Sequence, residues 1–294
     1  MGAAAALVSS ALWALTSVLL ASQAGRMRPV VMSAIRSATA SVIIFALLIA
    51  SSGLPQLKEM AVITAVSMAG SGILGQALGD TLYINALGFL GVSRTFPITN
   101  SAYPFLTFVL AVLLLGEALS WTLPIGGLLI VVGISWIVLE QRRADAAGAV
   151  RVELVRGVVF AVAAALAWAG ATVWLRGQQG NLDAFGAASL RIPAASVAVW
   201  ATIAMTRRDN PPLRQLTRRS IAIVAIAGML GTGVCSILFI YAVESIGAAK
   251  TAFVTTSAPV FALPMGVAFL SEKLTPRVLL GTAITIAGIW LVLL

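Results

Sequence analysis

Ten apolar stretches of about twenty residues each constrain this chain more than any other feature of its sequence. They lie near residues 3–24, 29–51, 60–87, 93–115 and 121–139, and again near 155–176, 183–205, 219–244, 249–270 and 276–293. An α-helix needs about 20 mostly apolar residues to cross the hydrocarbon core of a bilayer. The stretches are continuously apolar and do not alternate in polarity, so they favour membrane-spanning helices over the strands of a transmembrane barrel.

The share of charged residues supports the same interpretation. Only 10% of residues are charged and 60% are hydrophobic, whereas a soluble domain has about 25% charged residues to cover its surface. The outside of this protein must therefore face lipid. We predict an all-α integral membrane protein with ten transmembrane helices, and the lipid bilayer is its first partner.

The two sets of five helices are repeats of each other at a spacing of 155 residues. Four pairs of distinctive residues align in this way: Trp13 with Trp168, Arg36 with Arg191, Pro104 with Pro259, and Glu117 with Glu272. Because each repeat has an odd number of helices, the second repeat enters the membrane from the opposite side. Inverted repeats are typical of secondary transporters, whose substrate site lies near the membrane midplane where the repeats meet.

The repeats define the expected domain organisation. We predict a first five-helix repeat over residues 1–140, a polar linker over 141–154, and a second repeat over 155–294. A duplicated pair within one chain predicts that a monomer is sufficient for function.

Basic residues give the chain a net charge of +9, and they gather in the short loops on one side of the predicted bundle. Their position indicates membrane orientation rather than nucleic-acid binding. By the positive-inside rule this side is cytoplasmic, so both termini face outward from a cell (inner) membrane. The opposite side has only Lys58, Arg176 and Lys250.

A motif recurs at the end of the fourth helix of each repeat. Leu115-Gly-Glu-Ala-Leu-Ser120 precedes Gly126 and Gly133, and Leu270-Ser-Glu-Lys-Leu-Thr275 precedes Gly281 and Gly288. With these residues the chain resembles ten-helix members of the drug/metabolite transporter superfamily built from two EamA domains. The resemblance implies export of amino acids or other metabolites, or movement of sugars and their derivatives. It also implies termini inside the cell, which leaves the orientation open.

Polar residues precede the proline in the fourth helix of each repeat. They are Thr99, Asn100, Ser101 and Tyr103 in the first repeat, and Thr255, Thr256 and Ser257 in the second. Pro104 and Pro259 free the carbonyls of Asn100 and Thr255 from their helical hydrogen bonds. Such groups at membrane depth need a partner or a water-filled cavity. We predict a substrate site here, and the alternative is a pair of kinked packing helices.

Further candidates for substrate binding lie in the first and third helices of each repeat. Trp13 and Trp168 are inside their helices, where they either line a cavity or pack against small residues. The others are Gln76, Asp80 and Tyr83, with Tyr241 in the second repeat. Asp80 is an acid set well within a span, so it either couples transport to protons or pairs with a base such as Arg36 or Arg94.

Two further pairs of repeat residues are expected to be structural. Glu117 and Glu272 follow the fourth helices and would favour the N-terminus of the next helix. Arg36 and Arg191 lie about two turns inside the membrane and would extend their guanidinium groups to the headgroups.

The residue types exclude several kinds of chemistry. The chain has no His and a single Cys, so we expect neither a metal site nor a catalytic triad, and no cofactor. We predict a secondary transporter for a small polar metabolite, an amino-acid exporter in the first place. Uptake or exchange of sugar-like or organic-acid metabolites is the alternative, with Arg94 and Lys250 as the discriminating residues. A membrane enzyme is disfavoured, and a non-transporting scaffold is the third hypothesis.

Overall fold

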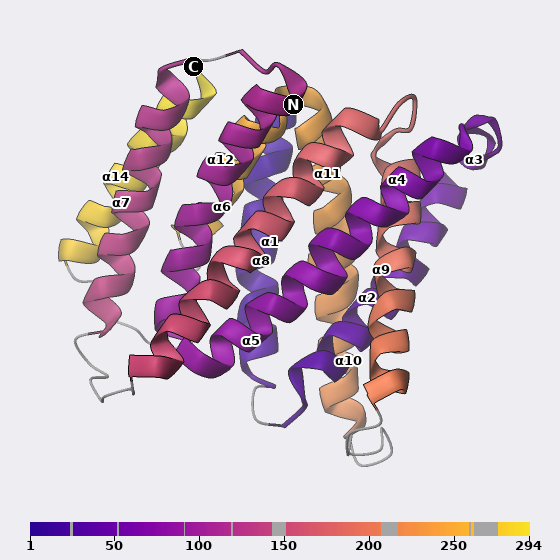
Figure 1. Cartoon of the computed structure of the whole chain (residues 1–294), viewed down its shortest axis with the longest axis horizontal. Helices are drawn as coiled ribbons and strands as arrows, with labels where there is room; N and C mark the ends of the chain where they lie inside the picture. Colours follow the sequence, from indigo (N-terminus) through magenta and orange to yellow (C-terminus); the bar gives the residue numbers. More distant parts are fainter. Residues whose placement is uncertain are drawn as a thin grey trace.

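The computed structural model describes residues 1–23, 26–51, 53–90, 92–118, 120–142, 151–206, 217–258, 260–261 and 276–294. Within these residues every regular element is a helix (Figure 1). The first half contains α1 (Gly2–Ala21), α2 (Pro29–Ala50), α3 (Leu54–Glu59), α4 (Val62–Gly72), η1 (Ile73–Gly79), α5 (Asp80–Leu90), α6 (Val92–Leu115) and α7 (Thr122–Arg142). The second half contains α8 (Arg151–Gln178), α9 (Ala184–Thr206), α10 (Arg218–Ala227), η3 (Gly228–Val234), α11 (Cys235–Ile246), α12 (Ala248–Thr255) and α14 (Pro276–Leu293).

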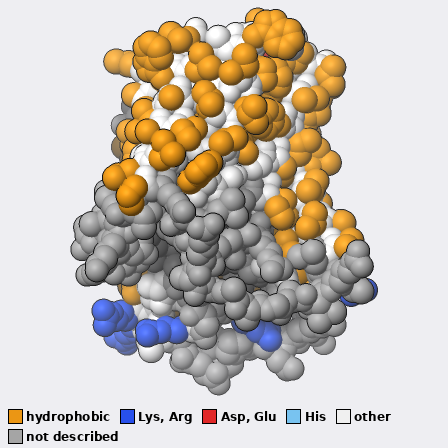
Figure 2. All heavy atoms as spheres, turned by 90° about the vertical axis from the view of Figure 1, so that its left-hand side faces the viewer, with side chains coloured by type: hydrophobic (Ala, Val, Ile, Leu, Met, Phe, Trp, Pro, Cys, Tyr) orange, Lys and Arg blue, Asp and Glu red, His pale blue; other side chains and the backbone are white. Residues whose placement is uncertain are grey.

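The outer surface of the bundle suits a lipid environment. Among the described residues, six helices are long and apolar enough to cross a membrane, and parts of α1, α7 and α14 are shorter apolar helices. Large apolar side chains point outward, with Leu113 73%, Trp121 72% and Val42 71% exposed. Figure 2 shows hydrophobic side chains over the upper part of one face and Lys and Arg side chains at its lower edge.

The halves are interleaved, and equivalent helices make equivalent contacts. Helix α2 packs against α9, and α7 packs against α14. In these two pairs, each helix contacts the equivalent helix of the other half. Helix α8 packs against α4, η1, α5 and α6, as α1 does against α10, η3, α11 and α12. Both chain ends lie on one face of the bundle (Figure 1). The predicted fold class, an all-helical membrane protein with duplicated and inverted halves, is confirmed.

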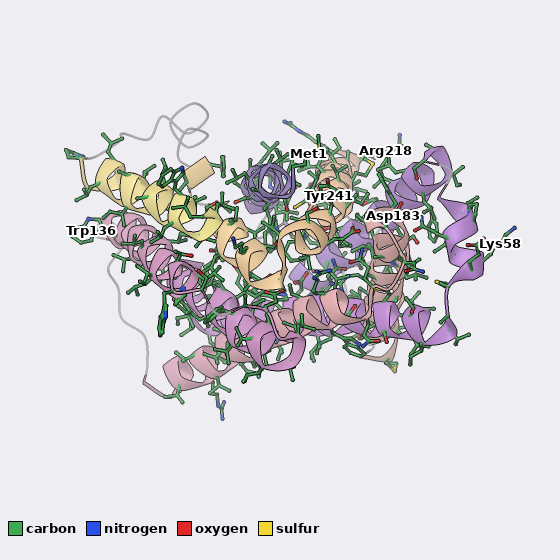
Figure 3. All side chains as sticks on the ribbon, turned by 90° about the horizontal axis from the view of Figure 1, so that it is seen from above. Met1, Lys58, Trp136, Asp183, Arg218 and Tyr241 are labelled. Atoms are coloured by element: carbon green, nitrogen blue, oxygen red, sulfur yellow. The ribbon has the colours of Figure 1, made fainter. Side chains whose placement is uncertain are left out.

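The pairs of helices occupy different parts of the bundle. The α7–α14 pair forms one edge, and it includes Trp136 (Figure 3). At the opposite edge the short helix α3 places Lys58 at the periphery. The remaining helices lie between these edges (Figure 3).

Glycines allow the halves to approach closely where their helices cross. A Cβ at Gly72 would overlap the backbone carbonyl of Arg191, and a Cβ at Gly228 would lie 2.7 Å from Cα and O of Arg36. Gly126 and Gly288 make a similar approach between α7 and α14. Small residues are typical of close helix crossings in membranes. The two central crossings therefore depend on glycine at positions 72 and 228.

A π-helical segment interrupts the third helix of each half at the same place. The segment η1 covers Ile73–Gly79, and η3 covers Gly228–Val234, so each begins and ends 155 residues from its counterpart. π-Helical turns are rare and are frequently found at functional sites. The first of these segments ends directly before Asp80.

Candidate functional site

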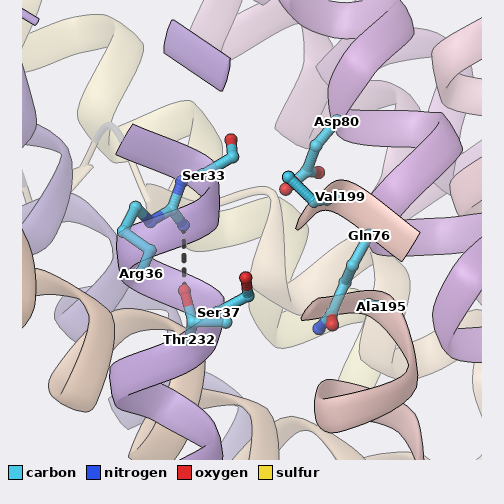
Figure 4. A pocket seen from close by; sticks show the side chains of 8 residues that line it. All are labelled: Ser33, Arg36, Ser37, Gln76, Asp80, Ala195, Val199 and Thr232. Carbon is cyan, nitrogen blue, oxygen red and sulfur yellow. Dashed lines mark hydrogen bonds between the residues drawn. The ribbon is translucent and has the colours of Figure 1, made fainter. Parts of the chain in front are cut away.

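A small polar cavity lies between the two halves near the π-helical segments (Figure 4). Its lining residues are Ser33, Arg36, Ser37, Gln76, Asp80, Ala195, Val199 and Thr232. Helix α2 and η3 supply one wall, while η1, α5 and α9 supply the facing wall. The cavity volume is about 20 Å³, enough for an ordered water molecule but too small for an amino acid.

Arg36 extends toward the other half of the protein. Its Nη2 donates a hydrogen bond to Thr232 Oγ1 at 3.1 Å, and Nε is buried without a partner among the described residues. The prediction that Arg36 extends to the headgroups was therefore wrong. The close crossing at Gly228 brings the partner hydroxyl within reach of the guanidinium group.

Gln76 and Asp80 form the facing wall of the cavity. Asp80 Oδ1 accepts a hydrogen bond from the indole nitrogen of Trp168 at 3.1 Å. Gln76 Oε1 is buried and has no hydrogen-bond partner in the described part of the chain. Asp80 and Arg36 therefore face one cavity from opposite walls (Figure 4), and each uses a different neutral partner.

Cys235 occupies the position of Asp80 in the second half, because both residues follow the π-helical segment of their half. Its thiol contacts Ser9 Oγ at 3.0 Å, away from the cavity lining. The acid is thus present in one repeat, and the site is asymmetric despite the symmetric backbone.

Three aromatic rings pack together next to Asp80. The ring of Trp168 is 5.3 Å from that of Tyr83 and 6.4 Å from that of Tyr103, measured between centroids. Tyr103 Oη is 3.2 Å from Thr172 Oγ1. A Cβ at Gly79 would lie 2.6 Å from the indole, so a glycine is needed for this packing. The structure brings together four of the predicted site residues here: Asp80, Tyr83, Tyr103 and Trp168.

We expect Trp168→Phe to weaken transport, because it removes the N–H group that holds Asp80 Oδ1 while it keeps an aromatic ring between Tyr83 and Tyr103. A hydrogen bond to a charged group contributes about 1.5–3 kcal/mol, so a roughly tenfold fall in kcat/KM is expected. Flux into proteoliposomes measures it. Trp174→Phe is the matched control, since Trp174 lies on the same helix and is 39% exposed; equal losses in both variants would contradict the assignment.

The polar residues before Pro104 and Pro259 are mostly occupied within their own helices. Thr99, Thr255 and Thr256 each donate to a carbonyl three or four residues earlier. Asn100 and Ser101 are half-buried and, like the rest of this set, do not line the cavity described above. Helix α6 continues through Pro104, whereas Pro259 lies outside the described residues.

The backbone carbonyl of Thr255, which Pro259 was predicted to free from its helical hydrogen bond, has a partner in α1. Ser10 Oγ donates to Thr255 O at 3.1 Å and lies 3.3 Å from Ser257 Oγ. All three residues are at most 1% exposed. The contact ties α1 to the end of α12 and satisfies a backbone group that would be costly to leave unpaired in a membrane.

Several other candidates lie away from the cavity. Trp13 is 41% and Tyr241 39% exposed, and neither side chain lines the cavity. Lys250 is half-buried in the first turn of α12. The side chain of Arg94 is outside the described residues.

Two of the predicted structural residues have partners other than those expected. Arg191 is 6% exposed and donates to Ser71 Oγ, so it does not reach the headgroups either. Glu117 accepts from the backbone of Ala248 and Ala249 at the start of α12, not from the helix that follows it. In both cases the partner is in the opposite half. Glu272 lies outside the described residues.

The sequence interpretation missed part of the cavity lining. Ser33 and Ser37 lie one turn apart on α2, and with Arg36 they form a polar stripe that helical spacing could have indicated. Thr232, Ala195 and Val199 come from the other half, and no local pattern identifies them.

Comparisons with known proteins agree with this architecture. The model of the EamA-like transporter family matches residues 1–139 and again residues 155–294. An uncharacterized transporter of Archaeoglobus fulgidus is 25% identical over 233 residues, which cover 79% of this chain and 77% of that protein. A solved crystal structure superposes with a TM-score of 0.81 at 17% identity, covering 100% of this chain and 98% of that one. The matches of both halves show that this chain is a multi-pass membrane transporter, not an enzyme, and that it belongs to the EamA-like transporter family.

Proposed function

We propose that this protein is a secondary transporter that exports a small zwitterionic metabolite of the amino-acid type by alternating access. The substrate site is the polar cavity between the halves. The cavity is too small for such a substrate in this conformation, so the helices around it separate before the substrate enters. Interleaved inverted halves support this motion, because they can exchange near-equivalent arrangements.

The observation that carries the proposal is the pair of opposite charges on facing walls. Among the residues that the structure describes, neither Arg36 Nε nor Gln76 Oε1 has a hydrogen-bond partner. Unsatisfied buried donors and acceptors are unfavourable by about 1–3 kcal/mol each, and a polar ligand removes that penalty. A guanidinium group suits a substrate carboxylate, while Asp80 across the cavity suits a substrate ammonium group.

Asp80 is also the group that we propose to exchange the coupling proton. An ionisable residue at membrane depth is costly and is commonly part of a proton relay. The equivalent position in the second half is Cys235, so the two equivalent positions together provide one carboxylate for protonation during the transport cycle.

We propose that the working unit is a monomer. It consists of a first repeat over residues 1–140 and a second over 155–294, joined by the linker 141–154.

The proposed orientation follows the basic side chains. Arg26, Arg28, Arg156, Arg218 and Arg219 are exposed, and the helix ends that carry them lie opposite the face with the chain termini (Figure 1). By the positive-inside rule this basic face is cytoplasmic, in the inner membrane.

Transport of sugar-like or organic-acid metabolites is the second candidate function. Arg36 alone would suffice for a carboxylate, and the hydroxyls of Ser33, Ser37 and Thr232 would suit a polyol. The presence of Asp80 in the same cavity favours a zwitterion over an anion. Its carboxylate would attract the ammonium group of a zwitterion, whereas it would repel a substrate that carries only negative charge.

Flux of a labelled panel of amino acids, organic acids and sugars into proteoliposomes tests the proposal. Arg36→Ala should reduce saturable amino-acid flux about tenfold or more, and Arg36→Lys should restore part of it, since a positive charge remains. Arg176→Ala is the control, because Arg176 is exposed at the end of α8. Flux of organic acids or sugars alone, or no flux of any amino acid, would overturn the proposal of a zwitterionic substrate.

A further inference from the structure

Glu117 joins the two halves at the face that contains the chain termini. Its Oε1 accepts the backbone N–H of Ala248 at 2.8 Å, and Oε2 accepts that of Ala249 at 3.3 Å. These are the first two residues of α12, whose N–H groups have no partner within the helix. The N-cap residue of α12 is Gly247, which has no side chain to accept them.

Two glycines with positive φ shape this contact from both sides. Gly116, at φ +65°, ends α6 and turns the chain so that Glu117 points back toward α12. Gly247 has φ +87°, and a Cβ there would lie 2.9 Å from Glu117 Oε1. A side chain at position 247 would therefore both strain the backbone and displace the carboxylate.

The surroundings make the contact stronger than an exposed helix cap. Ala248 and Ala249 are fully buried and belong to the same apolar cluster as Ala111 and Val243. A carboxylate that bonds two backbone N–H groups also interacts favourably with the helix dipole. Separation of α6 from α12 would leave buried donors without partners, so this contact holds the ends of two helices from different halves together.

The sequence has the same two residue types at the equivalent positions of the other repeat. Gly91 directly precedes α6, as Gly247 precedes α12, and Glu272 is the repeat counterpart of Glu117. Gly91 and Glu272 lie outside the described residues, so the equivalence is one of sequence position. A cap needed only for the stability of one helix could come from its own N-cap residue, as Thr217 does for α10.

We propose that Glu117 and the N-terminus of α12 form a latch that keeps the terminus-bearing face closed and opens whenever that face admits or releases substrate. The inference rests on the alternating-access transport proposed above. It identifies Glu117 as a residue that sets the balance between the two access states, without contact with the substrate.

Thiol labelling tests the latch without any knowledge of the substrate. A Ser33→Cys reporter is placed in the cavity wall, in a Cys235→Ser background, and treated with a membrane-impermeant maleimide in sealed vesicles. Vesicles that expose the terminus-bearing face are identified with a Lys58→Cys variant. We expect Glu117→Ala to speed labelling of the Ser33 reporter from this face about tenfold or more, because it removes two hydrogen bonds to a charged group.

Matched variants separate a latch from a simple helix cap. Gly247→Ala disturbs the same contact from the other side and should give the same direction of change, while Glu59→Ala, an exposed acid on α3, should give none. A Thr251→Cys reporter, fully buried in the first turns of α12, detects local fraying. Faster labelling at Thr251 with no change at Ser33, or equal acceleration by Glu59→Ala, would overturn the latch. These outcomes do not depend on whether any tested compound is transported.

Discussion

Gly72→Ala should greatly reduce the amount of folded protein, with a loss of about 3 kcal/mol or more in the free energy of unfolding. The added methyl group would overlap the backbone carbonyl of Arg191, and a backbone atom cannot move to another rotamer. Because α4 and α9 belong to different halves, the methyl group would force the halves apart at their centre. Unfolding in detergent, followed by helicity as the denaturant is raised, measures the loss.

Gly170→Ala is the matched control for this change. Gly170 also lies in a spanning helix, but the nearest atom to a Cβ there is Leu74 Cδ2 at 3.6 Å, an ordinary contact. We expect it to be neutral or slightly stabilising, since alanine favours the helix over glycine by about 1 kcal/mol. Similar unfolding curves for the two variants would show that the crossing at position 72 relaxes, and would contradict the role given to the glycine.

The architecture could be predicted from the sequence because the information is periodic. Apolar runs long enough to span a membrane specify helices, and the recurrence of Trp, Arg, Pro and Glu at one spacing specifies the duplication. Arg36 and Asp80 could be singled out by the same reasoning, since charged residues inside spans are rare. Each of these features can be recognised within the sequence of one helix, or by aligning the sequences of two helices.

The partners of these residues could not be predicted, because they are distant in the chain. Arg36 bonds Thr232, 196 residues away, and Glu117 bonds Ala248, 131 residues away. Such pairs depend on where the interleaved halves cross, which the glycines at 72 and 228 determine. The hydrogen bonds of the threonines in the fourth helices are local instead, because Thr99 and Thr255 donate to carbonyls of the preceding turn. A hydroxyl can bond the carbonyl of the preceding turn, so a polar residue at membrane depth is not necessarily free for a ligand.

Asp80→Asn should abolish most of the transport driven by a pH gradient, with a fall of about 10- to 100-fold in gradient-driven flux. The asparagine keeps the size of the side chain and an oxygen that can accept from Trp168, but it has no charge to face Arg36 or a substrate ammonium group. The expected loss is therefore larger than for Trp168→Phe, which leaves the carboxylate in place. Flux into proteoliposomes, with and without a pH gradient, measures both the loss and its dependence on protons.

The pH gradient decides between the two roles proposed for Asp80. If the carboxylate exchanges the coupling proton, Asp80→Asn retains exchange of internal for external substrate but no longer responds to the gradient. If the carboxylate only binds substrate, exchange and gradient-driven flux fall together. Asp183→Asn is the control, since Asp183 is exposed at the start of α9 and should change neither activity. Full activity of Asp80→Asn under both conditions would remove Asp80 from the site, and the proposed zwitterion would lose the group that distinguishes it from a simple anion.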